Sequence, residues 1–393
     1  MADSFNPPAT KSARRRPFRE FWARVTEGIE LDVLSRQFVS EAKASYRLYA
    51  KDVDWDRVGK ARGPVAKYWR TGWALFLAML MKLSPARRVL LLIAVGLLIF
   101  QPDFRWGKHG QASFHFGGIG VIILFVLLAV ELADRVTMKR DLEIAREIQQ
   151  WLVPKSAPRV EGMDIAFATR PQNTVAGDYY DAFVRPVAPA GSSAPPLLVA
   201  VADVAGKSVP AALLMATFQA SLQALAITPV PLREIIDGLD RYCRAHSLEG
   251  QRFTTAFVAE IDLQTREMHY VNAGHNDPIL RRRGTGAIER LSAGGPPFGL
   301  PSFGDAATAY ASARVRLDPG DLLVIFTDGV AEAVNEADEE YGETRLLACV
   351  QSAGNQTADA TLGKIMAEVN GFVGQARQRD DITCFVLRVN GES

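Results

Sequence analysis

The chain has 393 residues, of which 48% are hydrophobic, and its 45 basic and 44 acidic residues give a formal net charge of +1 at pH 7. This length suffices for one catalytic domain plus an accessory region, and the balanced charge argues against nucleic acid as a partner. The three cysteines, Cys243, Cys349 and Cys384, lack C-x-x-C spacing, which argues against a disulfide framework and a zinc site and favours a reducing cytoplasm.

The first 72 residues carry no recognisable chemistry. The basic residues between Lys11 and Arg19 are not followed by an apolar run at the distance expected of a cleaved signal peptide. From residue 17 onward, apolar residues recur at helical spacing amid mixed charge, as between Phe21 and Phe38. We therefore expect residues 1–72 to form a small helical region in the cytoplasm.

Residues 73–133 contain three apolar runs, Trp73–Met81, Val89–Phe100 and Gly117–Val130, and we interpret them as a transmembrane helical hairpin. A helix over Val89–Phe100 would cover only about 18 Å of a roughly 30 Å hydrocarbon core. It can span only if Arg88 and the aromatic residues beyond Phe100 extend it into the two interfaces.

Charge placement supports the hairpin, because basic residues precede the first span and follow the second, and few lie between them. Both ends would then face the cytoplasm, which predicts an inner-membrane protein with a cytoplasmic catalytic domain. The alternative is a soluble sensor domain with buried core helices, since apolar runs this short are common in protein cores. The paired runs with matching flanks favour the membrane.

Residues 134–158 are predicted to be an amphipathic linker that carries a signal. The stretch from Glu131 to Leu152 contains no Gly or Pro, and Pro154 ends it. Its apolar stripe consists of Met138, Leu142, Ala145, Ile148 and Leu152. The stripe fits two alternatives equally well: a homodimer contact between parallel helices, or an ordinary helix packed on its own domain.

Beyond Pro158, short β-like runs alternate with helical patterns. The predicted strands are Met163–Thr169, Tyr179–Val184, Leu197–Val204, Phe253–Leu263, Glu267–Ala273, Asp321–Thr327 and Ile382–Val389. The predicted helices are Pro210–Ala226, Leu232–His246 and Thr357–Phe372. Strands, then two consecutive helices, then more strands predict an α+β fold.

Four aspartates share one local arrangement, each at the tip of a strand-like run beside small or acidic residues. They are Asp178 in AGDYYD, Asp203 in VADVAGK, Asp328 in IFTDG and Asp380 in RDDIT. Buried carboxylates are costly unless a cation compensates them, and all-oxygen ligation favours Mg²⁺ or Mn²⁺. Each motif alone is usually just a turn, but together they predict two metal ions that activate water to hydrolyse a phosphate ester.

The ordered motifs GDYYD, ADVAGKS, NAGHNDP, GGPPFGL, FTDGV and RDDIT resemble the SpoIIE/RsbU-type branch of the protein phosphatase 2C-like (PPM) serine/threonine phosphatases, from about Ile144 to Val389. The resemblance implies a two-sheet antiparallel β-sandwich flanked by helices over residues 159–390, with two Mn²⁺ or Mg²⁺ ions at one edge.

The resemblance also implies roles for individual residues. Asp203 would bridge both ions with the carbonyl of Val204 as a further ligand, and Asp328 and Asp380 would complete one ion's shell. Asp178 would hold the ions directly or through water, so that Asp203 and Asp178 are the expected catalytic residues. Weaker candidates that would support these ligands are Asp181 and Asp381.

Some positions depart from the better-known branch of the superfamily or invite a second reading. Ala205 stands where that branch has a possible general-acid His, so the leaving oxygen would take a proton from metal-bound water or need none. Arg170 is the nearest candidate for a phosphate-gripping Arg and equally suits a surface role. Lys207 could touch phosphate, although a solvated lysine is commoner. We expect His275 to be structural and Cys384 to be an inert buried thiol.

These observations favour a phosphatase acting on phosphoserine or phosphothreonine in a protein. By resemblance, its substrate would be a phosphorylated anti-anti-sigma (STAS) protein in bacterial signal transduction. The alternative from another class is a membrane-tethered regulatory scaffold whose phosphatase fold turns over little, which the retained aspartates disfavour. A metallonuclease would also use carboxylates, but no basic patch accompanies them.

Overall fold

The computed structural model describes residues 64–106, 112–190, 192, 194–247, 252–292, 294–300 and 310–391. Most of the predicted N-terminal helical region, residues 1–63, lies outside the described residues. The chain divides into two compact units, with the boundary between Asp134 and Arg135.

The first unit contains the helices α4 (Pro64–Lys82) and α5 (Pro85–Phe100) and the beginning of α6 (Gly117–Leu152). Helix α5 begins after Ser84, whose side chain accepts a hydrogen bond from the backbone N–H of Arg87. Between α5 and α6, strands β1 (Asp103–Trp106) and β2 (Ala112–His115) pair antiparallel. These two strands were not predicted, because four-residue strands are too short to show alternation clearly.

Helices α5 and α6 pack against each other in antiparallel orientation. A Cβ on Gly120 of α6 would lie 2.9 Å from the carbonyl oxygen of Ala94 in α5. Nearer the start of α5, Arg87 forms ion pairs with Asp134 at 2.6 Å and with Glu131 at 3.2 Å. Large apolar side chains point outward from both helices: Val89, Leu92, Ile93, Ile99, Phe100, Val121, Ile122, Phe125, Val126 and Leu128.

Among the described residues, one helix is long and apolar enough to cross a membrane by length and composition: α7 (Ser208–Ala226). This helix belongs to the second unit and buries Met215, Phe218 and Leu222 in its core, as core helices of soluble domains also do. Helix α5 has only 16 residues. The transmembrane hairpin predicted for residues 73–133 therefore stays a prediction.

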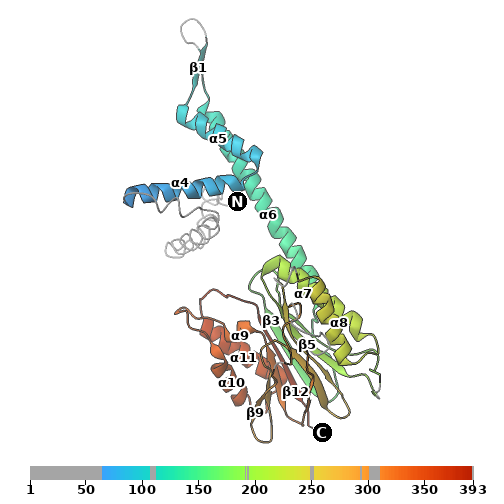
Figure 1. Ribbon diagram of the computed structural model, residues 1–393. Coiled ribbons are helices and arrows are strands. Elements are labelled where there is room, and N and C mark those ends of the chain that lie inside the picture. The colour runs from blue at the N-terminus through green and yellow to red at the C-terminus, as the bar shows by residue number, and fades with distance from the viewer. Residues whose placement is uncertain are drawn as a thin grey trace, which may run out of the picture. The chain divides into compact units, whose positions relative to one another are not determined.

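Helix α6 runs without interruption over 36 residues, so the second apolar run and the predicted linker form one helix (Figure 1). On the linker part, Met138 is 67% exposed and Ile148 is 49% exposed in the single chain. These two members of the apolar stripe therefore leave about half or more of their surface open.

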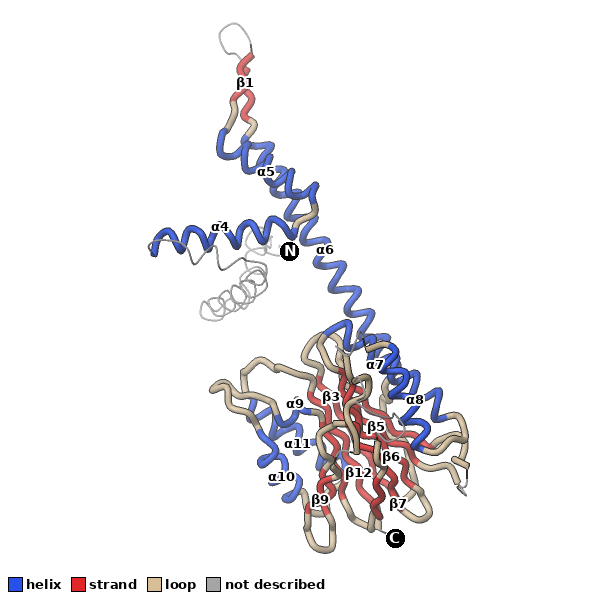
Figure 2. Tube along the Cα trace, in the orientation of Figure 1, coloured by secondary structure: helices blue, strands red, loops and turns tan. Residues whose placement is uncertain are grey.

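The second unit is a sandwich of two five-stranded antiparallel sheets, as the family resemblance implied (Figure 2). The first sheet has the order β10-β7-β6-β5-β4 and the second the order β3-β12-β11-β8-β9. The strands are β3 (Met163–Arg170), β4 (Tyr179–Val184), β5 (Leu197–Val204), β6 (Thr254–Ile261), β7 (Glu267–Ala273), β8 (Ile279–Arg281), β9 (Ile288–Arg290), β10 (Ala313–Arg316), β11 (Leu322–Phe326) and β12 (Ile382–Val389).

Alternating side chains of the central strands contribute to two hydrophobic layers, one between the two sheets and one between a sheet and its helices. Leu197, Val199 and Val201 of β5 face the second sheet, whereas Leu198 and Ala200 face the helices. Helices α7 and α8 (Leu232–Ala245) cover the outer face of the first sheet. Helices α9 (Asp328–Ala331), α10 (Gly342–Ser352) and α11 (Ala358–Val373) cover the second. Strands buried on both faces explain why their sequences are almost continuously apolar.

The strand register brings four strand ends to one edge of the sandwich. In the first sheet, Tyr179 at the start of β4 lies opposite Ala202 near the end of β5. In the second sheet, Phe326 at the end of β11 lies opposite Cys384 near the start of β12. All four predicted aspartates lie at or beside these four ends, with Asp203 inside β5 and the other three just outside the strands.

Candidate active site

The predicted acidic residues gather at this edge closely enough to affect one another's ionisation. Burial, together with the carboxylates of Asp328 and Asp380, raises the pKa of Asp203 to about 7. Burial and the Asp380 carboxylate raise the pKa of Asp328 to about 6. The pKa of Asp178 is also raised, chiefly by burial and further by Asp203 and Asp381. These carboxylates therefore form one cluster of mutually repelling charges.

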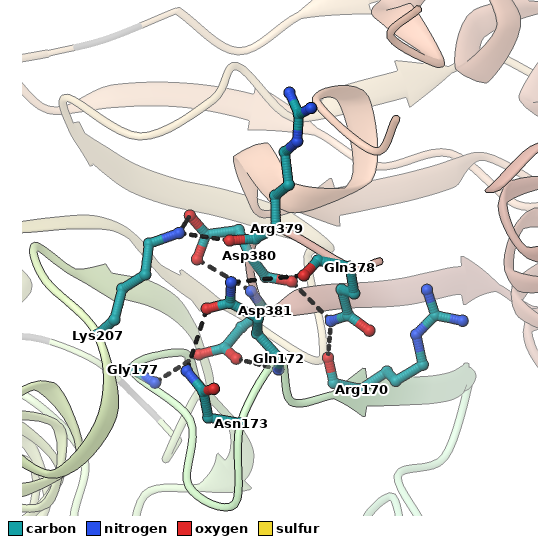
Figure 3. Close-up of polar contacts among 9 residues, drawn as sticks. All are labelled: Arg170, Gln172, Asn173, Gly177, Lys207, Gln378, Arg379, Asp380 and Asp381. Carbon is teal, nitrogen blue, oxygen red and sulfur yellow. Dashed lines mark hydrogen bonds and ion pairs between the residues drawn. The ribbon is translucent and has the colours of Figure 1, made fainter. Parts of the chain in front are cut away.

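Protein contacts hold two members of the cluster in place. The hydroxyl of Thr327 donates a hydrogen bond to Asp178 Oδ2 at 2.9 Å. Both oxygens of Asp381 accept backbone N–H groups, from Gln172 and from Gly177, each at 2.6 Å (Figure 3). Asp381, which we expected to support the ligands, thus fastens the segment before Asp178 to the start of β12.

Two glycines allow the backbone to approach the acidic side chains. A Cβ on Gly177 would lie 3.2 Å from the carbonyl oxygen of Val204 and 3.8 Å from Asp203 Oδ1. A Cβ on Gly329 would lie 1.9 Å from the carbonyl oxygen of Asp381. Larger residues at either position would push these strand ends apart.

The donor set fits a hard divalent cation, because it consists of carboxylates and the nearby carbonyl of Val204. Over the described part of the chain, no three or more His, Cys, Asp or Glu side chains are arranged so that they could hold a metal ion. Two of the predicted ligands have protein partners: Asp178 binds Thr327, and Asp380 pairs with Lys207 at 2.8 Å. The ligand roles of Asp178, Asp203, Val204, Asp328 and Asp380 accordingly stay predictions.

A cavity of about 250 Å³ opens directly beside the cluster. Its lining includes Lys207, Gly329, Glu332, Arg379 and Asp380. The cavity is thus lined by Asp380 and by Gly329, the residue after Asp328, and it has room for a phosphorylated side chain.

The structure does not bring every candidate to the site. The guanidinium of Arg170 hydrogen-bonds Asn370 and points away from the carboxylates (Figure 3). Asp181 accepts hydrogen bonds from the Tyr179 hydroxyl at 2.8 Å and from Gln223 at 2.7 Å. The side chains of Arg170 and Asp181 therefore bind other residues and do not reach the carboxylate cluster.

Other expected residues behave structurally. His275 is only 4% exposed, and its Nδ1 lies 3.1 Å from the hydroxyl of Thr255, the residue that pairs with Asp203 across β5 and β6. Burial raises the pKa of the Cys384 thiol to about 12, so that the thiol is protonated and unreactive at neutral pH.

Two residues at the site were missed by the sequence analysis. Thr327, which binds Asp178, directly precedes Asp328 in FTDGV, so its position in that motif was the available signal. Gln149 of α6 hydrogen-bonds the backbone of Ala176. No pattern in the sequence indicates that contact, because Gln149 and Ala176 are joined only by the tertiary fold.

The family model described as Stage II sporulation protein E (SpoIIE) matches residues 194–390, which is half of the chain. This chain belongs to the SpoIIE family. The matched segment runs from just before β5 to the end of β12 and contains Asp203, Asp328 and Asp380. The resemblance to the SpoIIE/RsbU-type branch is confirmed.

Two relatives show how far the similarity extends. Protein IcfG of Synechocystis sp. (strain ATCC 27184 / PCC 6803 / Kazusa) is 28% identical over 290 residues, covering 67% of this chain and 44% of IcfG. Phosphoserine phosphatase RsbU of Bacillus subtilis (strain 168) is 29% identical over 199 residues, covering 51% of this chain and 56% of RsbU. The chain therefore spans about half the length of these relatives.

Solved structures agree with the fold. The SiaA-PP2C domain of Pseudomonas aeruginosa matches with a TM-score of 0.54 at 23% identity, covering 65% of this chain and 98% of that domain. A structure of the PP2C phosphatase domain and a regulatory-domain fragment of SpoIIE from Bacillus subtilis matches with a TM-score of 0.50 at 17% identity, covering 59% and 63% of the respective chains. These matches identify the sandwich as a PP2C-type fold.

Proposed function

We propose that this chain is a metal-dependent protein serine/threonine phosphatase. The observation that carries the proposal is that Asp178, Asp203, Asp328 and Asp380 lie close enough to influence one another's ionisation, next to a cavity that Asp380 lines. The raised pKa values of Asp178, Asp203 and Asp328 reflect negative charge that lacks compensation, which Mn²⁺ or Mg²⁺ would provide. Membership of the SpoIIE family and the likeness to phosphoserine phosphatase RsbU support the same reaction.

Two bound ions would supply an activated water and neutralise charge on the phosphoryl group. The ions would be held by the carboxylates of Asp203, Asp328 and Asp380 and by the carbonyl oxygen of Val204. Thr327 would fix the rotamer of Asp178 through its 2.9 Å hydrogen bond. With Ala205 in place of a possible general acid, the leaving oxygen receives no proton from that position.

The proposed substrate is phosphoserine or phosphothreonine on a bacterial regulatory protein of the STAS (anti-anti-sigma) class. This step rests on the family resemblance and on the phosphoserine specificity named for the RsbU relative. A cavity of about 250 Å³ at the surface suits a side chain presented by a folded protein.

The proposal includes a location in the inner membrane, with residues 73–133 as the anchor and the catalytic domain in the cytoplasm. The outward-facing apolar side chains of α5 and α6 support it. The exposed positions Met138 and Ile148 of the linker stripe support a homodimer through α6.

Phosphate release from p-nitrophenyl phosphate and from a phosphoserine peptide, titrated with Mn²⁺, tests the function. We expect Asp203→Asn and Asp328→Asn each to lose at least about 100-fold in kcat/KM, because each removes a predicted ligand. Asp359→Asn, on the exposed first turn of α11, is the matched control and should retain activity. Equal activity in all variants would refute the site, and an inactive wild type that still binds Mn²⁺ would favour the scaffold alternative.

A further inference from the structure

One lysine side chain reaches into the acidic cluster. The ammonium of Lys207 lies 2.8 Å from Asp380 Oδ2 and also donates a hydrogen bond to the carbonyl oxygen of Arg379 (Figure 3). Lys207 and Asp380 both line the cavity beside the cluster. The positive charge of Lys207 also opposes the rise in the pKa of Asp328. The ammonium of Lys207 therefore interacts electrostatically with both Asp328 and Asp380, the two predicted ligands of one ion.

The backbone around Lys207 is held in an unusual conformation. Gly206 and Ser208 on either side have φ angles of 115° and 63°. Arg252 donates a hydrogen bond to the carbonyl oxygen of Ala205 at 3.2 Å and fills the space beside Gly206. The side chain of Lys207 is nevertheless 50% exposed. The backbone beside Lys207 is thus held by these contacts, whereas half of its side chain is open to solvent.

The arginines near the carboxylate cluster form hydrogen bonds or ion pairs with residues outside it. Arg170 binds Asn370, and Arg379, which lines the cavity, pairs with Asp338. Among the described residues that line the cavity, Lys207 is the cation paired with a predicted metal ligand. It is therefore the residue best placed to do what the missing phosphate-gripping arginine would do.

We propose that Lys207 is an internal counter-ion of the metal site: it neutralises Asp380 when no ion is bound there, gives way to the ion, and then binds the substrate's phosphoryl group in the cavity. The proposal rests on the proposed function. An ammonium and a divalent cation at neighbouring oxygens of one carboxylate repel each other, so each weakens the binding of the other to Asp380. A displaced ammonium still tethered at the rim is a suitable point charge for phosphate.

The first test measures Mn²⁺ binding to the purified full chain by isothermal titration calorimetry, without substrate. We expect Lys207→Met, which keeps the length of the side chain and removes the charge, to bind Mn²⁺ about tenfold more tightly because the competitor is gone. Lys207→Arg should stay close to wild type. Lys364→Met is the matched control, since Lys364 contacts Ser352 on the helical face of the domain and should leave affinity unchanged. Unchanged or weaker binding by Lys207→Met would overturn the proposal.

The second test measures hydrolysis of p-nitrophenyl phosphate at saturating Mn²⁺. We expect Lys207→Met to lose about 10- to 100-fold in kcat/KM and Lys207→Arg to restore part of it. Tighter metal binding with slower hydrolysis is a combination that simple misfolding does not produce. Full kcat/KM in Lys207→Met would remove the phosphoryl role.

The two proposals can fail separately. If the wild type binds Mn²⁺ and hydrolyses no phosphate ester, the proposed function fails, and the affinity comparison still decides whether Lys207 competes with the ion. If Lys207→Met loses its native circular dichroism spectrum, Lys207→Gln repeats both measurements with a polar, uncharged side chain.

Discussion

At the residue scale, His275 shows how burial controls ionisation near the site. Its ring contacts Thr255 and is almost fully enclosed, and burial lowers its pKa to about 4. The folded protein therefore holds this histidine neutral at physiological pH. In the unfolded chain the same side chain takes up a proton near pH 6.5.

This difference predicts an acid-sensitive contribution to stability. The contribution is fully present above pH 6.5 and is lost as the pH falls toward 4, because only the unfolded state binds the proton in that range. Between pH 7.5 and pH 5, the free energy of unfolding of the wild type should fall by about 2 kcal/mol more than that of His275→Asn. Urea denaturation of both proteins in EDTA measures this.

The comparison with His275→Asn is needed because the aspartates change the free energy of unfolding with pH in the opposite direction to His275. The raised pKa values of Asp203 and Asp328 destabilise the metal-free fold as the pH rises toward 7. This effect of the aspartates is the same in the wild type and in His275→Asn, so it cancels in the difference between their free energies of unfolding. Parallel stability profiles for wild type and His275→Asn would show that the histidine is not kept neutral.

The sequence predicts aspartates better than it predicts their neighbours. Asp178, Asp203, Asp328 and Asp380 could be singled out because strand ends set where they lie. The direction of a long side chain follows no such rule: Arg170 ends β3 near the site, yet its guanidinium turns to Asn370 of α11. The same reason hides the pairing of Lys207 with Asp380, residues 173 positions apart.

At the scale of elements, the end of α6 is tied directly to the site. The side-chain amide of Gln149 accepts the N–H of Ala176 at 2.9 Å and donates to its carbonyl oxygen at 2.7 Å. The next residue, Gly177, donates to Asp381, and Asp178 follows it. A rotation of α6 would therefore move the segment that carries Asp178.

We expect Gln149→Ala to raise the Mn²⁺ concentration for half-maximal activity about tenfold, as loss of a contact behind a metal ligand commonly does. Gln150→Ala is the matched control, because Gln150 is the exposed neighbour on the same helix. A metal-titrated phosphatase assay of the two variants beside the wild type measures the effect. Identical metal requirements in both would mean that α6 is only a tether.

Element length decides which strands the sequence reveals. The long strands β5 and β12 appear at their predicted bounds, Leu197–Val204 and Ile382–Val389, since eight residues carry a clear apolar pattern. Strands β8, β9 and β10 have three or four residues and were not predicted. Helix α7 begins at Ser208, two residues before the predicted Pro210, because proline fits the first turn of a helix.

At the scale of the whole molecule, the proposed membrane anchor predicts where the chain is found in cells. The full chain should sediment with the membrane fraction and resist extraction at alkaline pH, because the α5–α6 pair exposes apolar side chains around its surface. Residues 135–393, the second compact unit, should stay in the supernatant. Recovery of the full chain in the supernatant would favour the soluble sensor alternative.

The order of strands in the second sheet makes assembly of the site a late event in synthesis. Strand β12 lies between β3 and β11 and pairs with both, although more than two hundred residues separate it from β3. A ribosome must therefore release the chain through β12 before this sheet can close and bring Asp380 to its neighbours. Until β12 has been inserted, the nascent polypeptide consequently lacks the arrangement of carboxylates on which the proposed catalysis depends.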